Sequence, residues 1–237
     1  FKFCYTQGEI MGIYDRNYTQ GVGYQASYSD TALVNFVKTT YKFFAGSLLL
    51  ATVGALVGMA NFEVVAQYRI PIFILEIALI FGLGFVQDKP GINLAVFAAF
   101  SFISGLALAP ILTFVMVRNP AIIAQALAMT TIIFGIMSIF ALKTRRDLAN
   151  MGTALFWSVA VIFVFGLLNM FVFKSPMFQF VIASAVVLIF SLYVAYDTQN
   201  IVRGRYNNPI MAAISLYLDV LNIFTALLQI LGLTSRD

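Results

Sequence analysis

The sequence predicts an all-α protein that crosses a membrane seven times. Of its 237 residues, 61% are hydrophobic and only 10% are charged. Apolar stretches recur along the chain, and a bilayer-spanning helix needs about 20 such residues. The polar connections between the stretches are short, so neighbouring helices must run antiparallel, with no room for a soluble module. A soluble fold is therefore close to excluded.

The N-terminal part differs in composition from the rest. Residues 1–40 are polar and rich in Tyr, Gln, Asn, Ser and Gly, without the pattern of a cleavable signal peptide. We expect them to form a mobile cytoplasmic tail. Met11 could be the natural start, in which case residues 1–10 are not native. Residues 41–237 are expected to form one transmembrane domain.

Seven apolar stretches form this domain, and each can cross a bilayer if some tilt is allowed. They cover residues 41–60, 71–86, 93–116, 121–142, 152–173, 177–199 and 210–232.

The first three stretches carry individual signals. In the first, Gly54 and Gly58 have the GxxxG spacing that favours close helix packing. The second contains an acid, Glu76, about one and a half turns from its start. In the third, Pro110 follows Gly105 and predicts a break, which either frees backbone carbonyls near a cavity or serves packing alone.

The last stretch is the least apolar. Its polar residues Ser215, Asp219, Asn222 and Gln229 follow one another at intervals of four, three and seven. This spacing puts them on one side of a helix. A polar stripe turns away from lipid, so this helix should be central in the bundle.

The basic residues predict the orientation. One side of the domain carries Lys2, Arg16, Lys38, Lys42, Lys89, Lys143, Arg145, Arg146, Arg203 and Arg205, and the other carries Arg69, Arg118, Lys174 and Arg236. Cytoplasmic connections are enriched in Lys and Arg, which puts the N-terminus in the cytoplasm and the C-terminus outside. The net charge of +4 is spread over short connections, so nucleic-acid binding is not indicated.

Two aspartates are the main candidate functional residues. Asp197 precedes Asn207 by ten residues and Asp219 follows Asn208 by eleven, so in antiparallel helices both carboxyls are expected about 15 Å deep and within reach of each other. No Lys or Arg lies deep in a stretch to neutralise them, and acids inside a membrane are costly. Two such carboxyls can share a proton and titrate together. The chain has no histidine, which makes this pair the leading candidate for a proton sensor.

Further polar groups accompany the pair. Asn200 and Asn222 each follow an aspartate by three residues and would supply amides on the same helix face. Glu76 could line the outer half of the same pathway, or simply be hydrogen-bonded to a neighbouring helix. The single cysteine, Cys4, excludes a disulfide within the chain and a cysteine metal cluster.

Enzyme classes are poorly supported. Paired aspartates on adjacent spans suit an intramembrane aspartyl protease, but Leu216-Tyr217-Leu218-Asp219 lacks the Gly-x-Gly-Asp pattern. A serine or zinc intramembrane protease fails for lack of histidine, and a retinal protein fails because no span carries a lysine away from its ends. We therefore expect no enzymatic activity.

Several motifs carry a family likeness that covers the chain from about residue 35 onwards. They are Phe190–Ile201 (FSLYVAYDTQNI), Ala213–Phe224 (AISLYLDVLNIF), Leu227–Gly232 (LLQILG), Gly105–Leu112 (GLALAPIL) and Ile74–Glu76 (ILE). These motifs closely resemble the Bax inhibitor-1 family, the transmembrane BAX inhibitor motif proteins, and the chain looks like a bacterial member.

The resemblance implies seven helices, with the last wrapped by the other six, and a pH-dependent calcium leak across the membrane. It also implies that Asp197 and Asp219 form the pH-sensing pair near the pore, and that Glu76 is linked to ion passage. Some relatives carry an arginine at the cytoplasmic end of the second span that pairs with the first aspartate in the closed state. Here that region reads Val86-Gln87-Asp88-Lys89, and Gln87 could hydrogen-bond to a carboxylate but not neutralise it.

Two functions follow as expectations. The leading one is a calcium leak channel of the bacterial inner (plasma) membrane, gated by protons and without a cofactor. Calcium prefers about six to eight oxygen ligands, and Asp197, Asp219, Asn200, Asn222 and carbonyls near Pro110 would form a weak, transient site. The alternative is an interaction protein, because Ser235-Arg236-Asp237 resembles a branch of the family that modulates a membrane-anchored AAA+ protease.

Overall fold

The computed structural model describes residues 30–234, and within this range the chain is helical between short connections, with no strand. The helices are, in chain order, α2 (Asp30–Ala60), α3 (Phe62–Gln67), α4 (Arg69–Val86), α5 (Ile92–Ala107), α6 (Ala109–Arg118), α7 (Ala121–Lys143), η1 (Ala149–Met151), α8 (Gly152–Leu168), η2 (Asn169–Phe173), α9 (Pro176–Val202) and α10 (Pro209–Thr234).

Together these helices form seven spans that are long and apolar enough to cross a membrane, as predicted. The third span consists of α5 and α6, which are separated at Leu108. Pro110 is at the start of α6 and has no N–H to continue the helical hydrogen bonds of α5. The predicted break is therefore confirmed.

The first helix begins earlier than predicted. It starts at Asp30, so residues 30–40 are helical, although their polarity assigned them to the tail. Two of these residues, Phe36 and Thr40, are buried, and Phe36 belongs to the same apolar cluster as Ile201 on α9. Packing against the bundle thus extends the helix beyond its apolar stretch. The rest of the predicted tail, including residues 1–10, lies outside the described residues.

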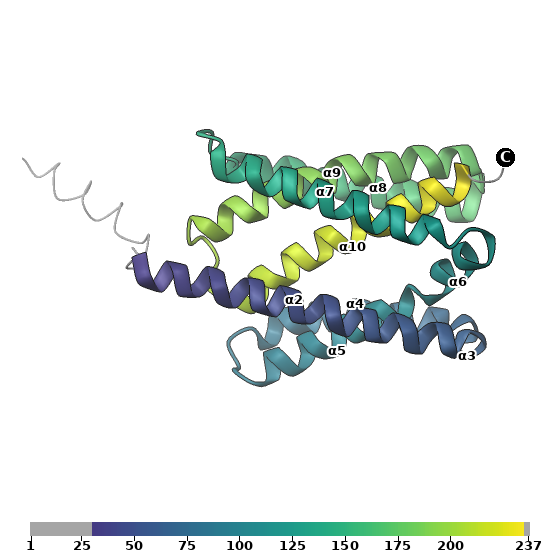
Figure 1. Ribbon diagram of the computed structural model, residues 1–237, viewed down its shortest axis with the longest axis horizontal. Coiled ribbons are helices and arrows are strands. Elements are labelled where there is room, and N and C mark those ends of the chain that lie inside the picture. Colours follow the sequence, from purple (N-terminus) through teal and green to yellow (C-terminus); the bar gives the residue numbers. More distant parts are fainter. Residues whose placement is uncertain (1–29, 235–237) are drawn as a thin grey trace, which may run out of the picture.

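The C-terminal helix is central, as predicted. In Figure 1, α10 runs obliquely through the middle of the bundle, and it contacts α2, α5, α6, α7 and α9. Over the most apolar 18 residues of α10, 61% are buried, compared with 6% over the same length of α4. Helix α4 packs mainly against α5, and α8 packs mainly against α9. Four spans therefore contact α10 closely, and two occupy outer positions.

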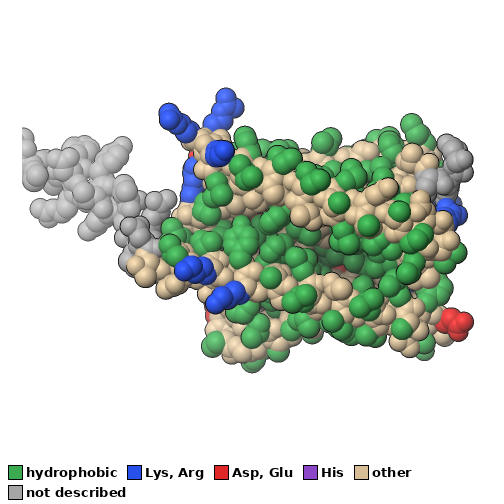
Figure 2. All heavy atoms as spheres, viewed as in Figure 1, with side chains coloured by type: hydrophobic (Ala, Val, Ile, Leu, Met, Phe, Trp, Pro, Cys, Tyr) green, Lys and Arg blue, Asp and Glu red, His purple; other side chains and the backbone are tan. Residues whose placement is uncertain are grey.

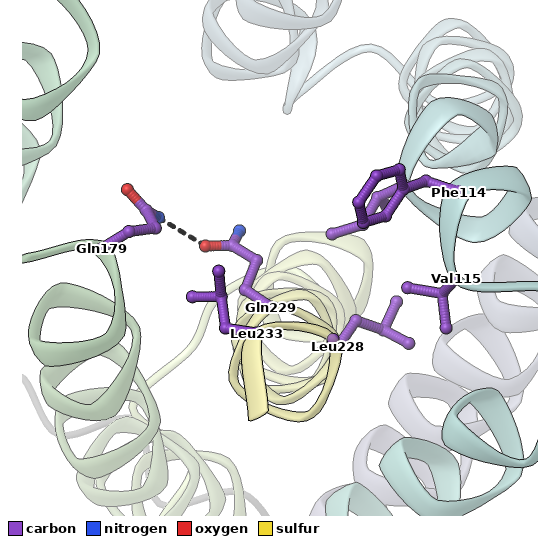
Figure 3. Close-up of a pocket in the computed structure, with 8 residues that line it drawn as sticks. Phe114, Val115, Gln179, Leu228, Gln229 and Leu233 are labelled. Carbon is purple, nitrogen blue, oxygen red and sulfur yellow. Dashed lines mark hydrogen bonds between the residues drawn. The ribbon is translucent and has the colours of Figure 1, made fainter. Parts of the chain in front are cut away.

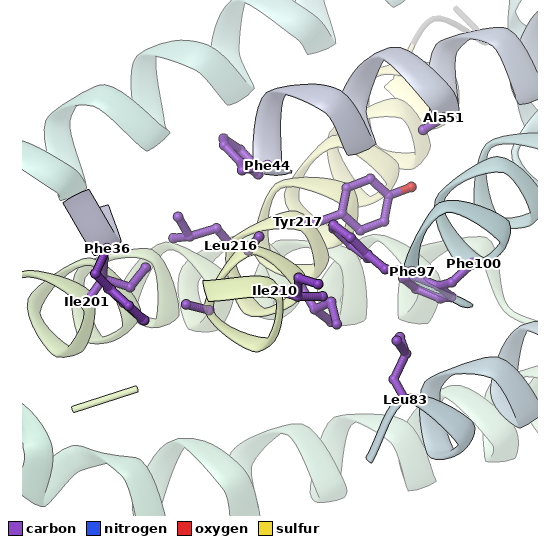
Figure 4. Packing of buried hydrophobic residues seen from close by; sticks show 13 residues of the cluster. Phe36, Phe44, Ala51, Leu83, Phe97, Phe100, Ile201, Ile210, Leu216 and Tyr217 are labelled. Atoms are coloured by element: carbon purple, nitrogen blue, oxygen red, sulfur yellow. The ribbon is translucent and has the colours of Figure 1, made fainter. Parts of the chain in front are cut away.

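One part of the interior around α10 is an apolar cluster. Figure 4 shows Tyr217 and Leu216 of α10 among side chains of α2, α5 and α9. The ring of Tyr217 makes an edge contact with Phe100, with centroids 5.7 Å apart. Both side chains are fully buried, so this cluster holds α10 against α5.

Charged groups gather at one end of the bundle, which we call the basic end. It is formed by the start of α2, the α4–α5 and α7–α8 connections, and the linker of residues 203–208 between α9 and α10. Figure 2 shows Lys and Arg side chains concentrated there, while hydrophobic side chains cover the body. Which side of the membrane this end faces stays a prediction from the charge count.

Candidate functional site

Asp197 and Asp219 meet inside the bundle. Asp197 is on α9 and Asp219 on α10, and their exposed fractions are only 4% and 3%. Their carboxyl groups interact directly with each other. The two acids that the sequence singled out therefore form one site.

The depth of the pair differs from the prediction. Helix α9 ends at Val202, five residues after Asp197, whereas Asp219 is ten residues into α10. Their distances from the helix ends are thus about 7.5 and 15 Å, not equal. The carboxyls meet because the linker between the helices is not helical and α10 crosses the bundle obliquely (Figure 1).

The surroundings of the pair are sparse in hydrogen-bond donors. The Tyr206 hydroxyl donates to Asp197 Oδ1 at 2.8 Å and is also hydrogen-bonded to Ser215 Oγ at 3.0 Å. Asp219 Oδ2 is buried and has no hydrogen-bond partner among residues 30–234. No ion pair joins either carboxyl to a Lys or Arg in the same range. Since a carboxylate oxygen only accepts, the two groups can hydrogen-bond to each other only when one carries a proton.

Tyr206 occupies the place that was predicted for Gln87. The backbone carbonyl of Gln87 accepts hydrogen bonds from the side-chain amides of Asn93, at 3.0 Å, and Asn208, at 2.7 Å. No hydrogen bond joins the Gln87 side chain to Asp197 in the part of the chain that the structure describes. The partner that sequence reasoning missed, Tyr206, belongs to the linker, where no periodicity predicts which way a side chain points.

A cavity of about 740 Å³ opens at the basic end next to the pair. Its walls come from the α4–α5 connection, the linker and the start of α10. They are Gln87, Asp88, Pro90, Asn93, Arg205, Tyr206, Asn207, Asn208 and Met211. Tyr206 lines this cavity and its hydroxyl is hydrogen-bonded to Asp197, so this side chain connects the cavity with the carboxyl pair.

Glu76 belongs to a second cavity, of about 510 Å³, between α4, α5, α6 and α10. Asn222, Ser104 and Pro110 also line it. Tyr217 of α10, two residues from Asp219, is hydrogen-bonded to Ser104, which lines this cavity. Three of the predicted residues, Glu76, Asn222 and Pro110, thus line one cavity, and neither aspartate is among its lining residues.

The two asparagines have different hydrogen-bond partners. Asn200 Oδ1 accepts a hydrogen bond from Arg205 Nη1 at 3.0 Å. Asn222 Nδ2 donates to the Leu218 carbonyl at 2.7 Å and lies in the Glu76 cavity. Among the described residues, no group of three or more His, Cys, Asp or Glu could hold a metal ion. A calcium site formed by the two aspartates and the two asparagines stays a prediction.

The polar stripe of α10 continues to the opposite end. Figure 3 shows Gln229 directed at Gln179 of α9, with Phe114, Val115 and Leu228 lining the adjacent cavity of about 260 Å³. Gln179 Nε2 donates to Gln229 Oε1 at 2.5 Å. Each member of the stripe thus faces another helix, the linker or a cavity, as its spacing predicted.

Comparisons with known proteins agree on one family. A family described as "Inhibitor of apoptosis-promoting Bax1" matches residues 33–236. A protein of Helicobacter pylori is 55% identical over 230 residues, which are 96% of this chain and 100% of that protein. The modulator of FtsH protease YccA of Escherichia coli is 34% identical over 172 residues, 70% of this chain and 78% of its own. A Golgi anti-apoptotic protein of vaccinia virus is 30% identical over 162 residues, 68% of this chain and 67% of its own.

The family match covers most of the transmembrane domain, including both aspartates and the break at Pro110. It agrees with the motifs quoted from the last two spans. The chain is an integral membrane protein of the Bax inhibitor-1 family.

Proposed function

We propose that this protein is a pH-sensitive calcium leak channel, gated by protonation of the Asp197–Asp219 pair. The observation that carries the proposal is the interaction of two buried carboxyls that form no ion pair with any Lys or Arg of residues 30–234. A structural pair of acids would be an expensive way to hold two membrane helices together.

The shared proton provides the gate. With one proton the two carboxyls attract each other, and without it two negative charges are confined at close range in the bundle. Gain or loss of that proton therefore changes the force between α9 and α10. A local charge change of this kind biases a two-state helix arrangement.

Cavities on both sides of the pair support a route for the ion. The basic-end cavity reaches Tyr206, and the Glu76 cavity opens on the α4 side of α10. Calcium would meet carboxylate, amide and carbonyl oxygens along this route, few at a time. Weak binding suits a conduction pathway, because the ion must leave each position again.

The test is calcium flux into dye-loaded proteoliposomes between about pH 6 and 8, the range in which a buried carboxyl pair could titrate. We expect Asp197→Asn and Asp219→Asn each to flatten the pH dependence, because an amide cannot take up the proton. Glu63→Gln, an exposed acid on α3 outside the described cavities, is the matched control and should keep it. A pH dependence that persists in both aspartate variants would refute the gate.

A second function is favoured by the relationship to YccA, which is named a modulator of FtsH protease. In this reading the chain is an inner-membrane protein that regulates a membrane-anchored AAA+ protease. The resemblance at Ser235-Arg236-Asp237 lies outside the described residues. Calcium flux by the purified chain alone supports the channel, whereas co-purification with such a protease and altered proteolysis, without flux, supports the modulator.

A further inference from the structure

The linker between α9 and α10 is fastened on two sides. Arg205 binds Asp147 of the α7–α8 connection at 2.6 Å, and Arg203 binds the same carboxylate at 3.2 Å. On the other side, Asn208 Nδ2 donates to the Gln87 carbonyl at the end of α4. The linker therefore bridges two other connections of the basic end.

Tyr206 is the linker residue that reaches inward. Its hydroxyl bonds to Asp197 Oδ1 on α9 and to Ser215 Oγ on α10, so it spans the gap between the two helices. Along α10, Met211 lines the basic-end cavity, Ser215 is one turn deeper, and Asp219 is one turn deeper again. Tyr206 thus stands at the level of Ser215, between the cavity and the carboxyls.

We propose that residues 203–208 form a lid over the carboxyl pair, with Tyr206 as the residue that closes it by binding Asp197. The proposal deepens the proposed function, because it names what shuts the basic-end entrance to the same site. It also stands on its own as a statement about access to the pair.

The Tyr206 hydroxyl is suited to donate a hydrogen bond to Asp197 throughout the neutral pH range. Burial, with the nearby Asp197 charge, raises the pKa of Tyr206 above its ordinary value, so the hydroxyl keeps its proton at neutral pH. Removal of the hydroxyl would leave Asp197 Oδ1 without this donor and the linker without its inner contact. The neighbouring guanidinium of Arg205 is bound to Asp147 and Asn200, which leaves the closing contact to Tyr206.

Access is measured by cysteine labelling in a Cys4→Ser background. Ser215→Cys places a thiol at the level of the Tyr206 hydroxyl, and Asn207→Cys places one on the exposed linker surface. With Tyr206 present we expect slow labelling of Ser215→Cys by a small cationic methanethiosulfonate. Tyr206→Phe should speed it about tenfold, as loss of one hydrogen bond to a carboxylate predicts, and Tyr206→Ala should speed it more. Asn207→Cys should react quickly in every background.

Calcium flux into proteoliposomes gives the second readout. Tyr196→Phe is the matched control, because Tyr196 precedes Asp197 in sequence but forms no hydrogen bond to it among the described residues. Tyr206→Phe should raise calcium flux at neutral pH about tenfold, and Tyr196→Phe should not. If no variant passes calcium but labelling of Ser215→Cys accelerates, the channel is refuted and the lid is supported. If the wild type conducts and neither Tyr206 variant changes labelling, the lid is overturned. Should the Ala variant fail to fold, the Phe variant decides.

Discussion

Both ion pairs among residues 30–234 involve Asp147, at the basic end. The hydrogen bond from Arg205, with one from the Ala149 backbone, lowers the pKa of Asp147 from 3.8 to about 2. The buried aspartates, by contrast, interact with each other, and Asp197 accepts a hydrogen bond from the Tyr206 hydroxyl. Ion pairs thus join the connections at the basic end, while the buried carboxyls have a hydroxyl donor and no ion pair among the described residues.

Asp147 should therefore stay charged over the pH range in which the aspartate pair is tested. Folding lowers its pKa, so the ion pairs stabilise the folded state fully above the ordinary value of 3.8, and this contribution is lost only as the pH falls through about 2. We expect Asp147→Asn to lower the melting temperature slightly, by the same amount at pH 8 and pH 6, because exposed ion pairs contribute little. Thermal unfolding in detergent checks this. A difference that vanishes between pH 8 and pH 6 would contradict the assignment.

Residue positions were predictable where helical periodicity defined them. The meeting of Asp197 with Asp219 followed from counting residues to a turn, although α9 ends earlier than that count assumed. The sequence could not predict the hydrogen bond of Tyr206 to Asp197 or that of Arg205 to Asn200. Both depend on how a linker without periodicity folds back on the bundle. The nearest signal was a tyrosine beside the Asn207-Asn208-Pro209 turn.

Helices α2 and α5 approach each other through glycine. A Cβ placed at Gly54 would overlap the Phe102 backbone, and one at Gly105 would overlap the Ala51 backbone. The predicted packing role of the GxxxG in the first span is therefore confirmed, with its partner identified as the third span. Sequence spacing indicated close packing but not against which helix.

Substitution of these glycines should separate the two helices. We expect Gly105→Ala to lower stability by about 1–3 kcal/mol or more, because the obstacle is backbone and cannot rotate away. Gly46→Ala, also in α2, is the control, since a Cβ there meets nothing within 4 Å and alanine favours helix. Thermal unfolding of the detergent-solubilised variants checks both. Equal stability of the two variants would mean that α2 and α5 are less tightly packed than the structure shows.

Helix positions were predictable from hydropathy, but helix ends were not. All seven spans appear where apolar stretches predicted them. Helix α2 nevertheless begins at Asp30, because Phe36 and Thr40 find buried positions that only the folded bundle provides. Hydropathy measures affinity for lipid, whereas these residues are helical because of contacts within the protein.

The whole molecule has one strongly basic end, and this predicts its orientation in a cell membrane. Arg145 and Lys174 are exposed at opposite ends of the bundle. In a Cys4→Ser background, a membrane-impermeant thiol reagent should label Lys174→Cys in intact cells with an accessible inner membrane, and Arg145→Cys only after permeabilisation. The reverse pattern would invert the proposed topology and the side from which the aspartate pair is reached.

Helix α10 contacts α9 at two polar points. One is the carboxyl pair at Asp219, and the other is the hydrogen bond between the side-chain amides of Gln179 and Gln229. They are ten residues apart, about 15 Å along the helix. Two such points oppose rotation of α10 about its own axis, since a rotation would separate both polar groups from their partners on α9. If repulsion opened the carboxyl contact, as the proposed gate requires, the hydrogen bond between Gln179 and Gln229 would still hold the far end of α10. We then expect the displacement of α10 to be largest at Pro209, where the linker joins it.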